Sequence, residues 1–168
     1  MNLESLTKQL IQIESISPND AGCFDILESI LEGMNFSCER ISYKNVENLY
    51  AVIGSQGPTL CFLGHTDVVP TGPSDQWTYP PFSGETHDDH IYGRGAADMK
   101  GNICAFVEAL GSFLKTEKLN YRIAILLTSN EEGTPEDGFI DELLKELKSR
   151  GETIDYCLVG EPSSSLKI

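Results

Sequence analysis

Apolar residues recur every three or four positions in four stretches of the chain, a spacing typical of amphipathic helices. The first stretch carries Leu3, Leu6 and Leu10 on one side. The predicted helices span residues 2–14, 24–33, 99–118 and 137–151. In other stretches apolar residues alternate or run together over a few positions, which predicts strands. The predicted strands are FSCERISYK, NLYAVIG, TLCFLGH, YRIAILLTSN and IDYCLVGEP.

Helices alternate with strands along most of the chain, and three strands (TLCFLGH, YRIAILLTSN and IDYCLVGEP) read as buried. Apolar runs of this kind are typical of strands covered on both faces. The order therefore predicts one α/β domain over residues 1–168, with a largely parallel mixed sheet flanked by helices. In such sheets, ligands bind beyond the carboxyl ends of the strands. A long polar loop over residues 70–89 is also more typical of a functional segment than of an idle connection.

The composition of the chain excludes several kinds of partner and site. The formal net charge is −14, which argues against nucleic acid and anionic membrane as partners, because both require a concentrated basic surface. Five scattered cysteines form no CxxC pair, so neither a thiolate zinc site nor a disulfide framework is expected. The chain shows no signal-peptide pattern and no apolar run near the ~20 residues that cross a bilayer. These features together predict a cytoplasmic protein.

Six polar side chains stand where strands end or a helix begins: His65, Asp67, Asp98, Glu131, Glu132 and Glu161. Each has an ordinary structural explanation, since Asp98 could cap a helix, Glu161 could be a solvated strand exit and His65 could be a hydrogen-bonded structural residue. Gathered on one rim, however, the carboxylates would repel one another unless cations were bound. Imidazole and carboxylates without thiolates suit zinc, cobalt or manganese in a hydrolytic site.

The spacing inside two of the motifs indicates that the two residues of each motif have different roles. In HTD, His65 and Asp67 lie on the same face of an extended strand, so the carboxylate can accept the second imidazole N–H and orient the ring. In EEG, neighbouring glutamates on extended backbone point to opposite sides. One can then bind metal, while the other, left unligated near the reacting water, is the expected general base.

Five segments occur in an order that resembles a known family: GHTDVVPTG, W..PPF at residues 77–82, YGRGAADMKG, TSNEEG and VGEPSS. They are similar to the dinuclear zinc amidohydrolases and metallopeptidases, which include succinyl-diaminopimelate desuccinylase, acetylornithine deacetylase and aminoacylases. Within that family, the first, third and fifth segments most resemble the desuccinylase branch. The resemblance implies the N-terminal part of a zinc-exopeptidase-like catalytic domain. It also implies hydrolysis of N-succinyl-LL-2,6-diaminopimelate to succinate and LL-2,6-diaminopimelate, a step of lysine and diaminopimelate biosynthesis.

The same resemblance implies a role for each candidate residue. His65 and Glu161 would bind one divalent ion, Asp98 would bridge two ions, and Glu132 would bind the second. Asp67 would orient His65, and Glu131 would be the general acid and base. The implied cofactors are two Zn²⁺ or Co²⁺ ions, and the implied substrate is a small succinylated amino acid.

The chain is shorter than members of this family, which are homodimers with an inserted lid or dimerisation domain and a further part of the catalytic domain. That further part carries another metal-binding histidine. We therefore expect the N-terminal part of the catalytic domain only, whose activity alone stays an open question. Two alternatives also stay open: an acetylornithine deacetylase-like or other acyl-amino-acid hydrolase, and a metal-binding but catalytically silent domain. The cluster at residues 87–90, HDDH, reads instead as a solvated hairpin tip.

Overall fold

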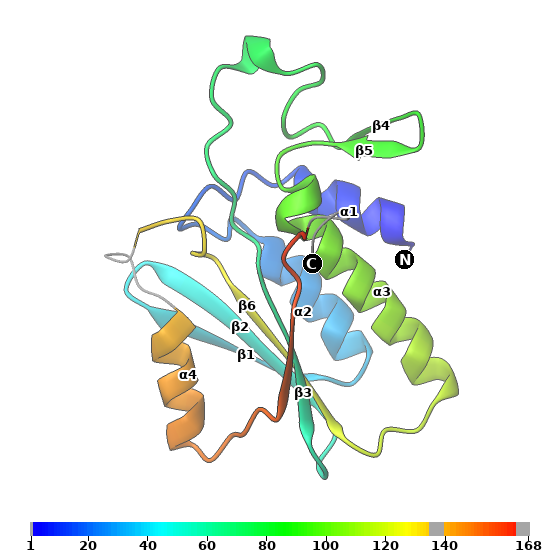
Figure 1. Cartoon of the computed structure of the whole chain (residues 1–168), viewed down its shortest axis with the longest axis vertical. Coiled ribbons are helices and arrows are strands. Elements are labelled where there is room, and N and C mark those ends of the chain that lie inside the picture. The colour runs from blue at the N-terminus through cyan, green and yellow to red at the C-terminus, as the bar shows by residue number, and fades with distance from the viewer. Residues whose placement is uncertain (1, 135–139, 164–168) are drawn as a thin grey trace.

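The computed structural model describes residues 2–134 and 140–163. Its centre is a five-stranded sheet with the strand order β1-β2-β6-β3-β7 (Figure 1). The strands are β1 (Ser37–Tyr43), β2 (Val46–Ile53), β3 (Thr59–His65), β6 (Arg122–Thr128) and β7 (Tyr156–Val159). β3 runs parallel to both β6 and β7, whereas β2 is antiparallel to β1 and β6. The predicted α/β fold with a mixed sheet is confirmed, and its parallel half carries the chemistry described below.

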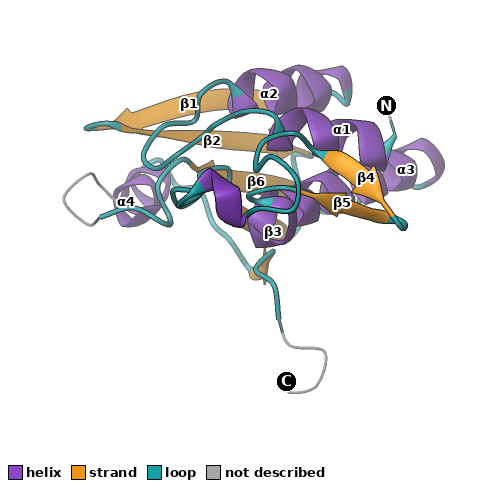
Figure 2. Ribbon diagram, turned by 90° about the horizontal axis from the view of Figure 1, so that it is seen from above, coloured by secondary structure: helices purple, strands orange, loops and turns teal. Residues whose placement is uncertain are grey.

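Helices cover the two faces of this sheet unequally (Figure 2). One face packs against α1 (Leu3–Ile11), α2 (Cys23–Gly33) and α3 (Gly101–Thr116). The other face packs against α4 (Ile140–Ser149) through Leu143 and Leu147. The predicted Asp137 start of this last helix lies outside the described residues. Because β6 supplies alternate residues to both apolar clusters, its nearly continuous apolar sequence is explained by burial on both faces.

The helix predicted from residue 99 begins two residues later. Before it lies a short π-helical turn, η2 (Ala96–Lys100), in which Asp98 has φ −128° and ψ 101°. This extended backbone interrupts the helical path, so α3 begins at Gly101. The N-cap of α3 is Lys100, which means that Asp98 is not the helix cap that its position in the sequence allowed.

The last strand differs from its prediction as a buried element. All four residues of β7 are exposed, and Tyr156 has 65% of its surface exposed. The reason is that, among the described residues, β7 pairs with β3 alone, and that neither apolar cluster of the sheet includes a residue of β7. An apolar run alone does not show whether a strand lies inside a sheet or at its edge, and here β7 lies at the edge.

A long connection between β3 and η2 rises above the carboxyl ends of the parallel strands (Figure 1). It contains the short turn η1 (Ser74–Gln76) and a two-stranded hairpin of β4 (Glu85–His87) and β5 (His90–Tyr92). The tip residues Asp88 and Asp89 have positive φ values of 47° and 61°, as a tight turn requires. The predicted hairpin tip is confirmed, and it is not part of the candidate metal site.

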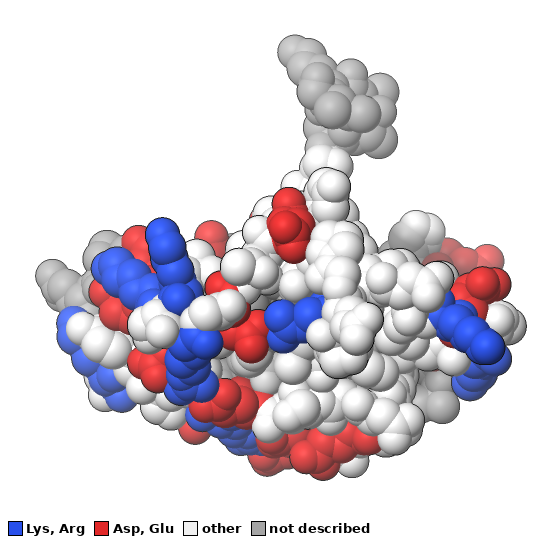
Figure 3. Space-filling view, turned by 90° about the horizontal axis from the view of Figure 1, so that it is seen from below, with Lys and Arg blue, Asp and Glu red and all other residues white. Residues whose placement is uncertain are grey.

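Two further observations concern the surface. On the face in Figure 3, basic side chains lie among acidic ones and do not form a continuous basic patch. Within the described part of the chain, every helix is too short or too polar to cross a membrane.

The buried side chain of Lys100 connects η2 to the first helix through hydrogen bonds. Its fully buried ammonium donates to the carbonyl oxygens of Leu10 and Ile13, each at 2.8 Å, near the carboxyl end of α1. Burial lowers the pKa of Lys100, and the helix dipole favours its charge there.

We expect Lys100→Met to lower the free energy of unfolding by about 1.5–3 kcal/mol, because both carbonyls lose a charged donor. Urea titration of the metal-free protein measures this loss. Lys8→Met is the matched control, since the half-buried Lys8 pairs with the exposed Glu4 on the helix surface, and its replacement should cost at most about 0.5 kcal/mol. Equal stability of the two variants would contradict the structural role assigned to Lys100.

Candidate metal centre

The parallel strands bring five of the six predicted residues to one edge of the sheet. His65 ends β3, Glu131 and Glu132 follow the adjacent β6, and Glu161 follows β7 on the other side. The register explains this placement, because His65 lies opposite Thr128 of β6, and Leu63 lies opposite Val159 of β7. Asp67 follows β3 by two residues, and Asp98 reaches the same place from η2.

The closest approaches centre on the imidazole of His65. Its Nε2 lies 3.1 Å from Oδ1 of Asp98 and 3.4 Å from Oε1 of Glu161. One ligand atom from each of His65, Asp98 and Glu132 can be chosen so that all lie within 4.8 Å of one another. Two ligands of one tetrahedral zinc, each at about 2.0–2.2 Å, lie roughly 3.3–3.6 Å apart. The spacing and the donor types therefore fit a divalent metal ion.

The ring of His65 is held so that Nε2 faces this group. Its Nδ1 lies 2.9 Å from the main-chain oxygen of Asp67 and 3.5 Å from the carboxylate Oδ1 of the same residue. With the Nδ1 proton donated to Asp67, Nε2 is the nitrogen left for a metal. The predicted pairing is present, although the main chain of Asp67 makes the shorter contact.

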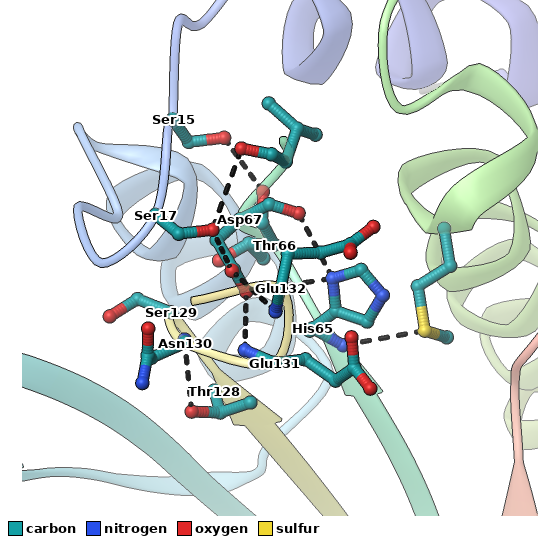
Figure 4. A network of polar contacts seen from close by, with 12 residues as sticks. Ser15, Ser17, His65, Thr66, Asp67, Thr128, Ser129, Asn130, Glu131 and Glu132 are labelled. Atoms are coloured by element: carbon teal, nitrogen blue, oxygen red, sulfur yellow. Dashed lines mark hydrogen bonds and ion pairs between the residues drawn. The ribbon is translucent and has the colours of Figure 1, made fainter. Parts of the chain in front are cut away.

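Asp67 is also the centre of a buried polar network (Figure 4). Its carboxylate accepts hydrogen bonds from the main-chain N–H groups of Glu131 at 3.0 Å and Glu132 at 3.1 Å, and from the hydroxyl of Ser17. Burial raises the pKa of Asp67, but the bonds from His65, Ser17 and Glu131 outweigh burial and hold it below its ordinary value. Asp67 thus joins the end of β3 to the turn after β6.

The sequence offered little sign of Ser17. It lies in the turn sequence SPND, where serine is ordinary, and it meets Asp67 only through the fold. Asn102 was missed for the same reason: its side-chain amide donates to the carbonyl oxygen of Gly160 at 2.6 Å, just before Glu161. This bond connects the first turn of α3 to the end of β7.

Met99 packs between the strands that carry two of the site residues. A Cβ atom added at Gly64 would lie 2.6 Å from Cε of Met99, and one added at Gly160 would lie 2.4 Å from it. The Sδ atom of Met99 also accepts the main-chain N–H of His65 at 3.4 Å. Glycine at these two positions therefore lets η2, and with it Asp98, sit directly against β3 and β7.

The site has an excess of negative charge that its own residues do not neutralise. Burial, followed by the nearby charge of Asp98, raises the pKa of Glu132. Burial and neighbouring carboxylates also raise the pKa of Glu161, against the opposing effect of His65. Burial would lower the pKa of His65, but Asp67 and Glu161 raise it to about 9. Such mutual repulsion is what a bound cation would relieve.

Glu131 and Glu132 differ in their surroundings. Glu132 is partly buried and belongs to the group that can hold a metal, whereas Glu131 is exposed and does not belong to it. The two neighbouring glutamates thus differ in position, one within the group that can hold a metal and one outside it. Their roles in catalysis stay predictions.

The family model for peptidase family M20/M25/M40 matches residues 61–168. The chain is 48% identical over 164 residues to a succinyl-diaminopimelate desuccinylase from Alkalilimnicola ehrlichii, covering 97% of this chain and 44% of the relative. It is 51% identical over 170 residues to a protein of the same name from Delftia acidovorans, covering 95% of this chain and 43% of the relative. The chain therefore spans less than half the length of these curated relatives.

A solved structure with the same fold is human carnosine dipeptidase 1. It matches with a TM-score of 0.85 and 23% identity, over 96% of this chain and 38% of the human protein. The family match, over residues 61–168, includes Cys61 in β3 and the candidate residues Asp98, Glu132 and Glu161. The chain belongs to peptidase family M20/M25/M40.

Proposed function

We propose that this chain is the metal-binding part of an amide hydrolase that cleaves N-succinyl-LL-2,6-diaminopimelate to succinate and LL-2,6-diaminopimelate. The observation that carries the proposal is the approach of Nε2 of His65 to carboxylates from two other elements, at 3.1 and 3.4 Å. The names of the relatives from Alkalilimnicola ehrlichii and Delftia acidovorans support the choice of substrate. The five free cysteines are typical of a reducing compartment and support a cytoplasmic location.

His65 and Glu161 would hold one divalent ion, Glu132 a second, and Asp98 would be shared between them. We propose Zn²⁺ or Co²⁺, because one imidazole and several carboxylates suit these ions. When bound, such ions acidify water and polarise an amide carbonyl. Asp67 would keep the Nδ1 proton of His65 in place, so that Nε2 stays available as a ligand.

Glu131 would move the proton in this reaction. Its main-chain N–H is held by Asp67, and its exposed side chain lies outside the metal-binding group. It would accept a proton from the attacking water and return it to the departing amine as the amide C–N bond breaks. Water thereby supplies one oxygen of the new succinate carboxyl group and one proton of the amine, and its second proton is released when that carboxyl group ionises.

The test combines metal analysis with hydrolysis. Replacing the matched segment of the Alkalilimnicola ehrlichii relative by this chain should give a hybrid that binds zinc and hydrolyses N-succinyl-diaminopimelate. In this hybrid, Glu131→Gln should lower kcat by about 10²–10⁴-fold with its zinc content unchanged. Glu132→Gln is the matched control, because it should lower zinc content as well as kcat.

Three results would count against the proposal. Hydrolysis of N-acetylornithine without hydrolysis of the succinylated substrate would contradict the substrate. A folded protein that takes up neither zinc nor cobalt tightly would contradict the metal site. Full activity of the Glu131→Gln hybrid would contradict the role of Glu131.

A further inference from the structure

A cavity of about 330 Å³ lies beside the candidate metal site. Asp98 and Glu132 line it, together with Val68, Val69 and the segment around Arg94. Among the described residues of this lining, Arg94 is the only one with a positive charge. A molecule that reaches the carboxylates of the site through this cavity therefore passes a guanidinium group.

The guanidinium of Arg94 is held on one of its faces. Its central carbon lies 5.1 Å from the centre of the Trp77 ring, a distance typical of a cation–π contact. The ring itself is anchored, because the indole N–H of Trp77 donates to the carbonyl oxygen of Thr71 at 2.9 Å. Stacking of this kind fixes the plane of a guanidinium and leaves the N–H groups along its edge for other partners.

Those N–H groups have few partners within the protein. Nη2 makes one long bond of 3.4 Å to the carbonyl oxygen of Pro70, and Nε is buried without a hydrogen-bond partner among the described residues. A buried N–H left without a partner is rare in folded proteins. In the described part of the chain Arg94 also forms no ion pair, whereas the other arginines do: Arg40, Arg122 and Arg150.

We propose that Arg94 is a substrate-recognition residue, and that its guanidinium binds a carboxylate of the acylated amino acid whose amide bond lies at the metal site. A carboxylate can accept two parallel hydrogen bonds from the edge of a guanidinium. A local cation is needed for this, because the chain has a net charge of −14 and the cavity is otherwise acidic. The inference rests on the proposed function for the reaction, but carboxylate binding can be measured without turnover.

Trp77 provides a direct signal for this binding, since it is the only tryptophan of the chain and carries Arg94 on its ring. Titration of the zinc-loaded protein with succinate should change the tryptophan fluorescence in a saturable way, and neutral succinamide should not. The side-chain Nε–H signal of Arg94 in a ¹H–¹⁵N spectrum should shift over the same succinate concentrations.

Variants identify the binding group. Arg94→Gln should weaken succinate binding at least tenfold, and Arg94→Lys should recover part of the loss. Unchanged zinc content and an unchanged melting curve of Arg94→Gln would separate recognition from a merely structural role. Titration with N-succinyl-alaninamide and with N-acetyl-alanine then shows whether the bound carboxylate belongs to the acyl group or to the amino acid.

Two results would overturn the proposal. Binding of succinate by Arg94→Gln as tight as by the unmodified protein would assign the carboxylate to the metal ions or to another group. Equal responses to succinate and succinamide would show that charge is not recognised. Absence of hydrolysis, or of zinc uptake, bears on the proposed function instead, and titration of the zinc-free protein measures the contribution of Arg94 in that case.

Discussion

The affinity of this chain for zinc is expected to rise by about tenfold per pH unit through the neutral range, as His65 gives up the proton on Nε2. Burial lowers the pKa of His65, but the hydrogen bonds and charge of Asp67, with the charge of Glu161, raise it from 6.5 to about 9. In the metal-free protein at neutral pH, a proton therefore occupies the nitrogen that faces Asp98 and Glu161. Metal binding must displace that proton.

The sign of the effect follows from these values. Metal and proton compete for Nε2, so affinity rises with pH until His65 is neutral without metal, near pH 9. In the metal-free protein, the raised pKa stabilises the fold fully below pH 6.5, and this contribution is lost as the pH rises through about 9. The raised pKa values of Glu132 and Glu161 make metal affinity rise more steeply with pH at acidic pH, because these carboxyl groups must also lose a proton before they bind an ion.

Competition with a chromophoric chelator between about pH 6 and 9 measures the affinity, after correction for protonation of the chelator. Calorimetry in buffers of different ionisation enthalpy counts the protons released. We expect about one proton from His65 for each ion that this residue binds. Affinity that stays flat over this range would mean that His65 is neutral in the metal-free protein.

Replacement of Asp67 by alanine is expected to affect both stability and metal binding. The carboxylate is fully buried, and its loss removes the acceptor for Ser17 and for the N–H groups of Glu131 and Glu132. It also removes the carboxylate that lies 3.5 Å from Nδ1 of His65, although the main-chain oxygen at 2.9 Å stays. Removing one member of a buried charged pair lowers the free energy of unfolding by roughly 3–5 kcal/mol. Losing a carboxylate partner of a metal-binding histidine typically lowers metal affinity by about 10–100-fold, and we expect a loss near the lower end because the main-chain contact to His65 stays.

Ser17→Ala is the matched control for Asp67→Ala. It removes one donor and leaves the other bonds of Asp67 in place, so it should cost only about 1 kcal/mol and leave zinc affinity nearly unchanged. Urea unfolding of the metal-free variants and zinc competition give both quantities. If the two variants prove alike in stability and in affinity, the central position assigned to Asp67 in the network is wrong.

Much of this arrangement could be predicted from the sequence, because a few strong patterns determine it. The apolar runs of β3 and β6 identify strands buried on both faces, and parallel strands place their carboxyl ends together. His65 and Glu132 therefore fall at one edge without any knowledge of distant contacts. The position of a residue at this edge could be predicted where it depends only on the strand that carries the residue.

The features that were missed depend on contacts between distant segments. Ser17 reaches Asp67 across 50 positions of sequence, and Lys100 reaches Leu10 across 90. The exposure of β7 depends on the absence of a second neighbouring strand or covering helix among the described residues, which an apolar pattern does not report. The late start of α3 depends on the extended backbone at Asp98, in a segment whose composition is compatible with a helix.

Because β7 lies at the edge of the sheet, the two sides of the candidate site differ in their stability against local opening. His65 stands on an interior strand, whereas Glu161 follows a strand that, among the described residues, pairs with β3 alone. Edge strands with few buried contacts open at a lower free energy than the strands inside a sheet. An ion bound by both residues would link β3 to β7. Pairing of β7 with the sheet and binding of the ion would then be thermodynamically coupled, each favouring the other.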